Sequence, residues 1–178
     1  MSSQLFYAFM AFFAIMNPIS NLPAYMALVA DDSQKISRKI AFRSLLIAFV
    51  IITVFIFSGD FIFKVFGITI VSFRIAGGIL VAVIGYHMIN GNHSPSYKGP
   101  GTITTALSLA NGGLQNQLIT VVAFALLCVI TYLLLRSAKQ IAGFLGENLM
   151  KIITKMMGLL LFSIGIQMII VSVQTLIK

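Results

Sequence analysis

The chain has 178 residues, of which 59% are hydrophobic and 9% are charged, and its mean hydropathy is +1.03. Soluble domains carry about 25% charged residues, so the composition excludes an ordinary soluble domain and predicts an all-α polytopic membrane protein. The net charge of +8 does not indicate nucleic-acid binding, because the basic residues fall in short loops between apolar runs. One cysteine, Cys128, excludes an internal disulfide framework and a cysteine zinc site.

The first apolar run, Leu5–Ala30, is interrupted by the stretch Asn-Pro-Ile-Ser-Asn-Leu-Pro at 17–23. Each proline removes a backbone donor and clashes with the preceding turn. Irregular backbone at membrane depth is tolerated only where it is buried in protein or lines a watery cavity. One kink needs one proline and no asparagine, so a broken helix that forms a binding site, as in transporters, is favoured over a kink that only shapes packing.

Five further apolar segments follow in chain order. Asp31 to Ser33 is expected to cap the second one, and Gly67 predicts a tight turn after it. A polar loop at 90–98 precedes a short segment rich in threonine and serine, and another loop follows Arg136. The expected segments are Ile40–Phe63, Ile68–Ile89, Thr102–Ala110, Leu118–Leu135 and Met156–Ile177.

The distribution of basic residues predicts the orientation. Six crossings with both termini outside the inner (plasma) membrane place nine basic residues inside: Lys35, Arg38, Lys39, Arg43, Lys98, Arg136, Lys139, Lys151 and Lys155. Three basic residues then lie outside, namely Lys64, Arg74 and Lys178. This bias also argues that the segment after Pro100 crosses the membrane.

An internal repeat relates residues 78–89 to residues 158–169, at an offset of 80 without a gap. Gly78 and Gly85 align with Gly158 and Gly165, and Pro18 falls near Pro100 at almost the same offset. The chain is then one transmembrane domain, 1–178, with halves of about 1–89 and 95–178. Three crossings in each half make the halves inverted, so the broken first and fourth helices would meet at mid-membrane. The glycines are expected to allow close helix packing.

The two breaks predict a site for a small anionic group. Helices that start after Pro23 and after Gly101 present unsatisfied N–H groups and a positive dipole end, which suit an amino-acid carboxylate. Thr102 or Asn21 is expected to serve as N-cap, and Gly99 and Gly101 let a ligand approach the backbone. For the hydroxyl residues of 102–108, contact between helices is an equal alternative. The candidate substrate-binding residues are Asn17, Pro18, Ser20, Asn21, Pro23, Gly99, Pro100, Gly101, Thr102 and Thr105.

No carboxylate lies deep in a predicted span, because Asp31, Asp32, Asp60 and Glu147 all fall at span edges. A carboxylate proton relay therefore has no candidate, and neutral solutes are favoured over cations. Three other side chains are candidates for coupling or gating: Arg74, His87 and Gln167.

Each of these has a structural alternative. Arg74 either snorkels to the outer interface, towards Asp60, or pairs with an anionic ligand. His87 and its repeat equivalent Gln167 either form hydrogen bonds between helices or take part in proton coupling. A metal pair of His87 and His93 is weakly supported, since no acidic or cysteine partner is near them in the sequence.

Three motifs resemble those of the MarC family of bacterial and archaeal membrane proteins: residues 17–23, Phe-Arg-Ile-Ala-Gly-Gly-Ile-Leu at 73–80 and Gly-Pro-Gly-Thr-Ile at 99–103. The resemblance implies a six-helix inner-membrane protein, grouped with the lysine-exporter superfamily, in a family that includes neutral amino acid transporters. The family usually has a further apolar, proline-containing stretch before Gly-Pro-Gly. Here the polar Asn90–Lys98 stands in its place, which indicates an internal deletion or missing residues.

We therefore expect a secondary transporter or exporter of small neutral amino acids or similar metabolites, without cofactor or catalytic residues. Coupling to a sodium ion or a proton stays open, as does a homo-oligomer. The rival class is a non-transporting membrane scaffold or accessory protein whose breaks only shape packing. An intramembrane enzyme is disfavoured by the lack of buried carboxylates and metal ligands.

Overall fold

The computed structural model describes residues 2–91 and 98–177, and this part of the chain forms seven helices and no strand. The all-α prediction is confirmed. The helices are α1 (Ser2–Met16), α2 (Leu22–Leu28), α3 (Gln34–Phe66), α4 (Ile70–Ile89), α5 (Lys98–Ala110), α6 (Leu114–Arg136) and α7 (Ala138–Ile177).

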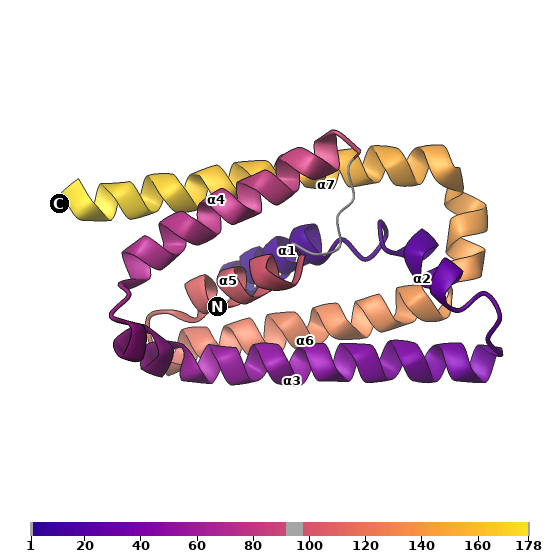
Figure 1. The fold of residues 1–178 in the computed structure, drawn as a ribbon, viewed down its shortest axis with the longest axis horizontal. Coiled ribbons are helices and arrows are strands. Elements are labelled where there is room, and N and C mark those ends of the chain that lie inside the picture. The colour runs from indigo at the N-terminus through magenta and orange to yellow at the C-terminus, as the bar shows by residue number, and fades with distance from the viewer. Residues whose placement is uncertain (1, 92–97, 178) are drawn as a thin grey trace.

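The four long helices form two layers, with shorter helices between them (Figure 1). Helices α3 and α6 lie side by side in one layer, and α4 and α7 pack together in the other. Helix α1 contacts α6 and α7, and α5 contacts α3, α4 and α6. Helices α1 and α5 therefore connect the two layers.

Four helices are long and apolar enough to cross a membrane: Gln34–Gly59, Ile70–Ile89, Leu114–Arg136 and Asn148–Ile177. By contrast, α1 has 15 residues and α5 has 13. At about 1.5 Å per residue both are shorter than the roughly 30 Å of a hydrocarbon core. Helices α1 and α2 follow each other through the break towards the end where α3 begins (Figure 1), so the predicted break in the first helix is confirmed.

Local signals set both ends of α3 as predicted. The Ser33 hydroxyl accepts the Ile36 N–H at 3.5 Å and caps α3. Gly67, with φ of 62°, ends the same helix in the left-handed conformation. The expected loop after Arg136 is wrong, because α7 begins at Ala138 and is interrupted only at Gly146, with φ of 66°. Lysine, leucine and alanine residues there are good helix formers, so the helix includes the basic residues that were assigned to a loop.

The glycines of α4 and α7 pack backbone against backbone. A Cβ added at Gly165 would lie 2.5 Å from both the Gly78 oxygen and the Ala82 nitrogen. A Cβ at Gly85 would lie 2.6 Å from the Gly158 oxygen and 2.5 Å from the Phe162 nitrogen. The prediction that these glycines allow close packing is confirmed.

The contact between α4 and α7 has approximate two-fold symmetry. Gly78 meets Met168 and Ile169, and the equivalent Gly158 meets Met88 and Ile89. Each pair of neighbours is the repeat equivalent of the other, at the offset of 80. Since Gly78 lies against Gly165 and Gly158 against Gly85, the two helices are antiparallel, and each presents the same surface to the other.

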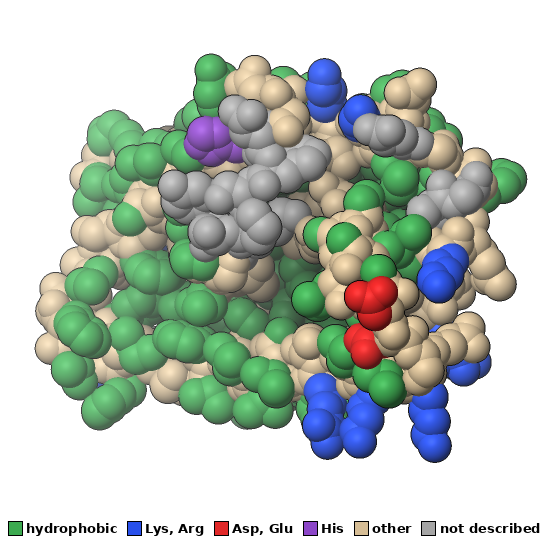
Figure 2. Space-filling model, turned by 45° about the vertical axis from the view of Figure 1, so that its right-hand side comes forward, with side chains coloured by type: hydrophobic (Ala, Val, Ile, Leu, Met, Phe, Trp, Pro, Cys, Tyr) green, Lys and Arg blue, Asp and Glu red, His purple; other side chains and the backbone are tan. Residues whose placement is uncertain are grey.

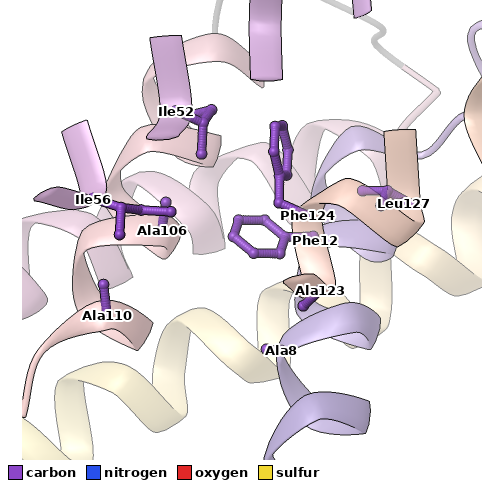
Figure 3. Close-up of a cluster of buried hydrophobic side chains, with 9 residues drawn as sticks. All are labelled: Ala8, Phe12, Ile52, Ile56, Ala106, Ala110, Ala123, Phe124 and Leu127. Atoms are coloured by element: carbon purple, nitrogen blue, oxygen red, sulfur yellow. The ribbon is translucent and has the colours of Figure 1, made fainter. Parts of the chain in front are cut away.

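The short helices are held by a buried apolar cluster (Figure 3). Phe12 of α1 meets Phe124 of α6 edge to face, with ring centroids 5.0 Å apart. Small residues of α5, Ala106 and Ala110, lie in the same cluster and let that helix approach closely. The full cluster is Ala8, Phe12, Ile52, Ile56, Ala106, Ala110, Ala123, Phe124 and Leu127.

Charged and apolar side chains occupy different parts of the surface. Lysine and arginine side chains gather where α3 begins, α6 ends and α7 begins, which we call the basic end (Figure 2). The flanks are covered by apolar side chains, with Phe57, Val129 and Leu159 each about half exposed. Such a surface suits lipid rather than water.

Candidate functional site

The first break is closed by its own polar groups. Asn17 is fully buried and has φ of 37°, in the left-handed region that asparagine tolerates better than most residues. Its backbone N–H donates to the Phe13 oxygen at 2.9 Å, and its Oδ1 accepts the Ser20 N–H at 3.2 Å. Its Nδ2 is buried without a protein partner. Asn17 therefore determines the path of the chain and leaves one donor for a small guest.

Asn21 ties the two fragments of the broken helix together. It occupies the N-cap position of α2, but its side chain makes no capping bond, so the prediction that it caps α2 is wrong. Its Nδ2 instead donates to the Met16 oxygen at 2.9 Å. Met16 ends α1, where carbonyls lack helical partners, and the amide satisfies one of them. Pro18 is buried beside it, whereas Pro23 is exposed in the first turn of α2.

The second predicted break, around Pro100, does not have the expected geometry. Helix α5 already includes Lys98, so Gly99 and Pro100 lie in its first turn, where proline is well tolerated, and Thr102 is not an N-cap. Gly99 and Pro100 are exposed. A Cβ at Gly101 would lie 2.7 Å from Ile84 and 2.9 Å from Ile15, so side chains fill the space that a ligand was expected to use. The contact with Ile15 brings the start of α5 to the end of α1.

A cavity of about 140 Å³ lies between α1, α4, α5 and α7. Three of the predicted residues line it: Arg74, Thr105 and Gln167. Its full lining is Tyr7, Ala11, Arg74, Thr105, Ser108, Leu109, Ile164, Gln167, Met168 and Val171. Ser108 follows Thr105 by three residues, which places both on one helix face. Nothing in the sequence around Tyr7 indicated its place in the cavity.

The polar groups of this cavity are only partly satisfied. The Arg74 guanidinium donates to the Ser108 carbonyl oxygen at 3.2 Å, in the last turn of α5, and so satisfies the negative end of that helix. The hydroxyls of Thr105 and Ser108 are buried without a protein partner. An unmade hydrogen bond of this kind costs about 1–3 kcal/mol. The cavity is thus lined mainly by apolar side chains, with Arg74, Gln167 and these two hydroxyl residues among them. The alternative partner of Arg74, the Asp60 side chain, lies outside the described residues.

A second cavity of about 300 Å³ adjoins the first. It is lined by Ser3, Gln4, Tyr7, Ala8, Leu109, Asn116 and Ile119. Tyr7 and Leu109 line both cavities, so these two side chains stand between them. The second cavity includes residues from the beginnings of α1 and α6, which lie away from the basic end (Figure 1).

Comparison with known proteins decides the family. The MarC family of integral membrane proteins matches residues 2–96 and 93–177, nearly the whole chain. The chain belongs to the MarC family. A UPF0056 membrane protein of Pyrococcus horikoshii is 35% identical over 180 residues, which cover 89% of this chain and 88% of that protein. YvbG of Bacillus subtilis is 29% identical over 197 residues, covering 95% and 93%. No solved structure matches.

The MarC relatives carry residues that this chain lacks. The alignment with YvbG runs over 197 positions, more than the 178 residues of the chain. The two matched segments of the family meet at 93–96, within the polar stretch where a deletion was expected. Residues 92–97 lie outside the described structure. Only 90–97 separate α4 from α5, too few residues for a second copy of the 15-residue α1.

His87 does not join the cavity of this MarC protein. It lies half-buried in the last turn of α4, with its ring 6.0 Å from that of Tyr86. Its repeat equivalent Gln167 lines the cavity, because antiparallel packing places equivalent positions at opposite ends. His93 lies outside the described residues, so the metal pair stays a prediction. Within the described chain, no group of three or more His, Cys, Asp or Glu could hold a metal.

Proposed function

We propose that this MarC-family protein is a secondary transporter or exporter that moves small neutral amino acids, or metabolites of similar chemistry, across the inner membrane. The observation that carries the proposal is the cavity between α1, α4, α5 and α7, in which Arg74 lies beside two unpartnered buried hydroxyls. Its volume of about 140 Å³ is below the roughly 300–1,000 Å³ of pockets for drug-sized ligands, which suits a small solute.

The proposed architecture is an inverted repeat of six crossings. Helices α1 to α4 form one half, and α5 to α7 form the other. The approximate two-fold contact of α4 with α7 supports this arrangement. So do the reciprocal contacts of the short helices, since α2 contacts α6 and α7 while α5 contacts their equivalents α3 and α4. Both termini then lie outside, and the basic end lies in the cytoplasm.

The cavity has groups for both ends of a zwitterion. A guanidinium has five N–H donors, so Arg74 can hold a carboxylate while keeping its bond to α5. The Thr105 and Ser108 hydroxyls can accept hydrogen bonds from an ammonium group. The Gln167 side-chain amide can donate to the carboxylate or accept from the ammonium group. None of the described residues that line the cavity is acidic, which disfavours solutes with net positive charge.

Access would alternate between the two sides. Towards the outside, only Tyr7 and Leu109 separate the cavity from its larger neighbour. Towards the basic end, the break contains the fully buried residues Asn17, Pro18 and Leu22, and we propose that they close this side. Rocking of the two halves around the break at 17–21 would open that side. His87 and Gln167 stay candidates for gating or for coupling to sodium or protons.

The proposal is tested by uptake of labelled glycine, alanine and serine into proteoliposomes, with and without a sodium or proton gradient. Thr105→Val removes the cavity hydroxyl at constant shape and should raise the KM about tenfold, because a hydrogen bond to a charged group is worth about 1.5–3 kcal/mol. Thr53→Val is the matched control, since Thr53 also has a buried unpartnered hydroxyl but does not line the cavity. Its KM should stay unchanged.

The variant Asn21→Ala tests whether the substrate binds at the break rather than in the cavity. If the solute sits at the break, this variant raises the KM more than Thr105→Val does. Equal effects of Thr105→Val and Thr53→Val would refute the cavity as the site. Absence of saturable uptake from monodisperse, helical protein would refute transport of these solutes.

The scaffold alternative has one observation in its favour. The first break is tied within the chain, because the Asn21 Nδ2 donates to the Met16 oxygen. The space beside Gly101 is filled by Ile15 and Ile84. A scaffold predicts that millimolar amino acid leaves the melting temperature unchanged, whereas a transporter is stabilised by its solute.

A further inference from the structure

A separate pocket of about 290 Å³ lies at the basic end. It is built by α2, the connection from α2 to α3, the start of α3, the end of α6 and the start of α7. Its lining is Tyr25, Met26, Val29, Asp32, Gln34, Ser37, Arg38, Leu135, Arg136, Ser137, Ala138, Lys139 and Gln140. None of the residues that line the proposed transport cavity takes part, so this pocket is independent of the transport proposal.

The charges of the pocket suit an anion. The described lining has three basic side chains, from Arg38, Arg136 and Lys139, and one carboxylate, from Asp32. Arg38 is half-buried, and its Nε is fully buried without a hydrogen-bond partner. A guanidinium N–H withdrawn from water needs an acceptor. Arg38 therefore brings positive charge to the pocket and has an N–H that no described group of the chain satisfies.

Backbone groups of both polarities line the pocket, since Val29 and Ser137 follow the C-terminal ends of α2 and α6. Gln34 is the first residue of α3, and Ala138, Lys139 and Gln140 are the first three of α7. The first N–H groups of a helix have no partner within it and form the positive end of its dipole. Two helix N-termini and three basic side chains thus line one pocket. Phosphate is the group that such combinations bind best.

We propose that this pocket binds a phosphate-bearing anion, supplied by the headgroup of an acidic phospholipid or as free phosphate. Basic pockets at the cytoplasmic ends of membrane helices suit acidic headgroups, and anionic lipids are enriched in that leaflet. Apolar side chains next to the pocket segments are available to acyl chains, since Leu28 is 71% exposed and Ile36 is 49% exposed. The Asp32 carboxylate can accept a hydrogen bond from a headgroup hydroxyl.

The test compares full-length protein in nanodiscs of pure phosphatidylcholine with nanodiscs that contain 30% phosphatidylglycerol, with and without inorganic phosphate. Native mass spectrometry counts bound lipid, and circular dichroism gives the melting temperature. We expect phosphatidylglycerol to raise the melting temperature by about 5 °C. Arg136→Gln should remove most of that shift.

Two further variants distinguish loss of the pocket's charge from a general effect on folding or surface charge. Lys139→Gln removes an exposed charge of the pocket, so it should fold normally and still reduce the shift. Arg43→Gln is the matched control, because Arg43 is an exposed arginine of α3 that does not line the pocket. Its shift should equal that of the wild type.

The two conditions, phosphatidylglycerol in the nanodisc and inorganic phosphate in solution, distinguish the source of the anion. Stabilisation by phosphatidylglycerol alone identifies a lipid headgroup, and stabilisation by inorganic phosphate in phosphatidylcholine nanodiscs identifies a free anion. Either result supports the site when Lys139→Gln weakens it. The proposal is overturned if neither probe stabilises the protein, or if Arg43→Gln weakens the response as much as Lys139→Gln.

Discussion

Gly165→Ala should separate α4 from α7, although it adds a single methyl group. The new Cβ would lie 2.5 Å from the Gly78 oxygen, 2.5 Å from the Ala82 nitrogen and 2.9 Å from the Ala82 Cα. All three are backbone atoms, so no rotamer change can relieve the contact. The two helices must move apart along their glycine face.

The expected cost follows from two opposing terms. Overpacking costs about 1–3 kcal/mol, and the backbone contacts here place it near the upper value. Replacing glycine by alanine inside a helix returns about 1 kcal/mol. The net destabilisation is therefore about 1–2 kcal/mol, which lowers the melting temperature by about 2–4 °C for each kcal/mol.

Thermal melts of purified protein, followed by circular dichroism, measure this effect. Gly85→Ala is the repeat equivalent and should cost the same, because its Cβ meets backbone atoms at 2.5, 2.6 and 2.9 Å. Gly99→Ala is the control, since nothing lies within 4 Å of its Cβ and the helix should gain stability. If Gly165→Ala were as stable as Gly99→Ala, the close packing of α4 against α7 would be refuted.

The remaining predictions concern the break and the end of α5. Asn17→Ala should be about 1–2 kcal/mol less stable than Asn17→Gly, because the left-handed conformation penalises alanine and not glycine; equal melting temperatures would contradict the φ of 37° at this position. Arg74→Gln should lose about 1–2 kcal/mol of unfolding free energy with its charged hydrogen bond to Ser108, whereas the exposed Arg43→Gln should change it by less than about 0.5 kcal/mol. If the two arginine variants melt alike, Arg74 does not stabilise the end of α5.

The features that could be predicted from sequence are those that depend on neighbouring residues. Two prolines and two asparagines within seven residues locate the break at 17–21, because each acts on its own backbone. Ser33 at the beginning of α3 and Gly67 at its end likewise act on their own backbone. The glycine repeat predicted close packing, since a stripe of small residues has few other uses in a membrane helix. The start of α7 was missed because its basic residues were assigned to a loop.

The candidate site depended on which helix faces meet, and that was only partly visible. Arg74, Thr105 and Gln167 were singled out separately, each for being polar in an apolar segment, and packing brings all three to one cavity. Tyr7 joins them from α1 without a local signal. The asparagines of the break mark polarity rather than a pocket, because much of their hydrogen bonding goes to the backbone: Asn17 to Ser20 and Asn21 to Met16.

The two halves of the proposed inverted repeat are unequal, and this inequality bears on where a solute would bind. The contact of α4 with α7 keeps its approximate two-fold symmetry, but in the described part of the chain no helix equivalent to α1 precedes α5. The break before α2 is consequently tied by asparagines of its own half, whereas the start of α5 packs on Ile15 and Ile84 of the other half. Unsatisfied hydroxyls then remain on α5, at Thr105 and Ser108. The break also has an unpartnered group, the Asn17 Nδ2, but Asn17 lines none of the three cavities described above. Because a binding site needs both unsatisfied polar groups and space for a ligand, the cavity beside α5 is a better candidate for substrate than the break.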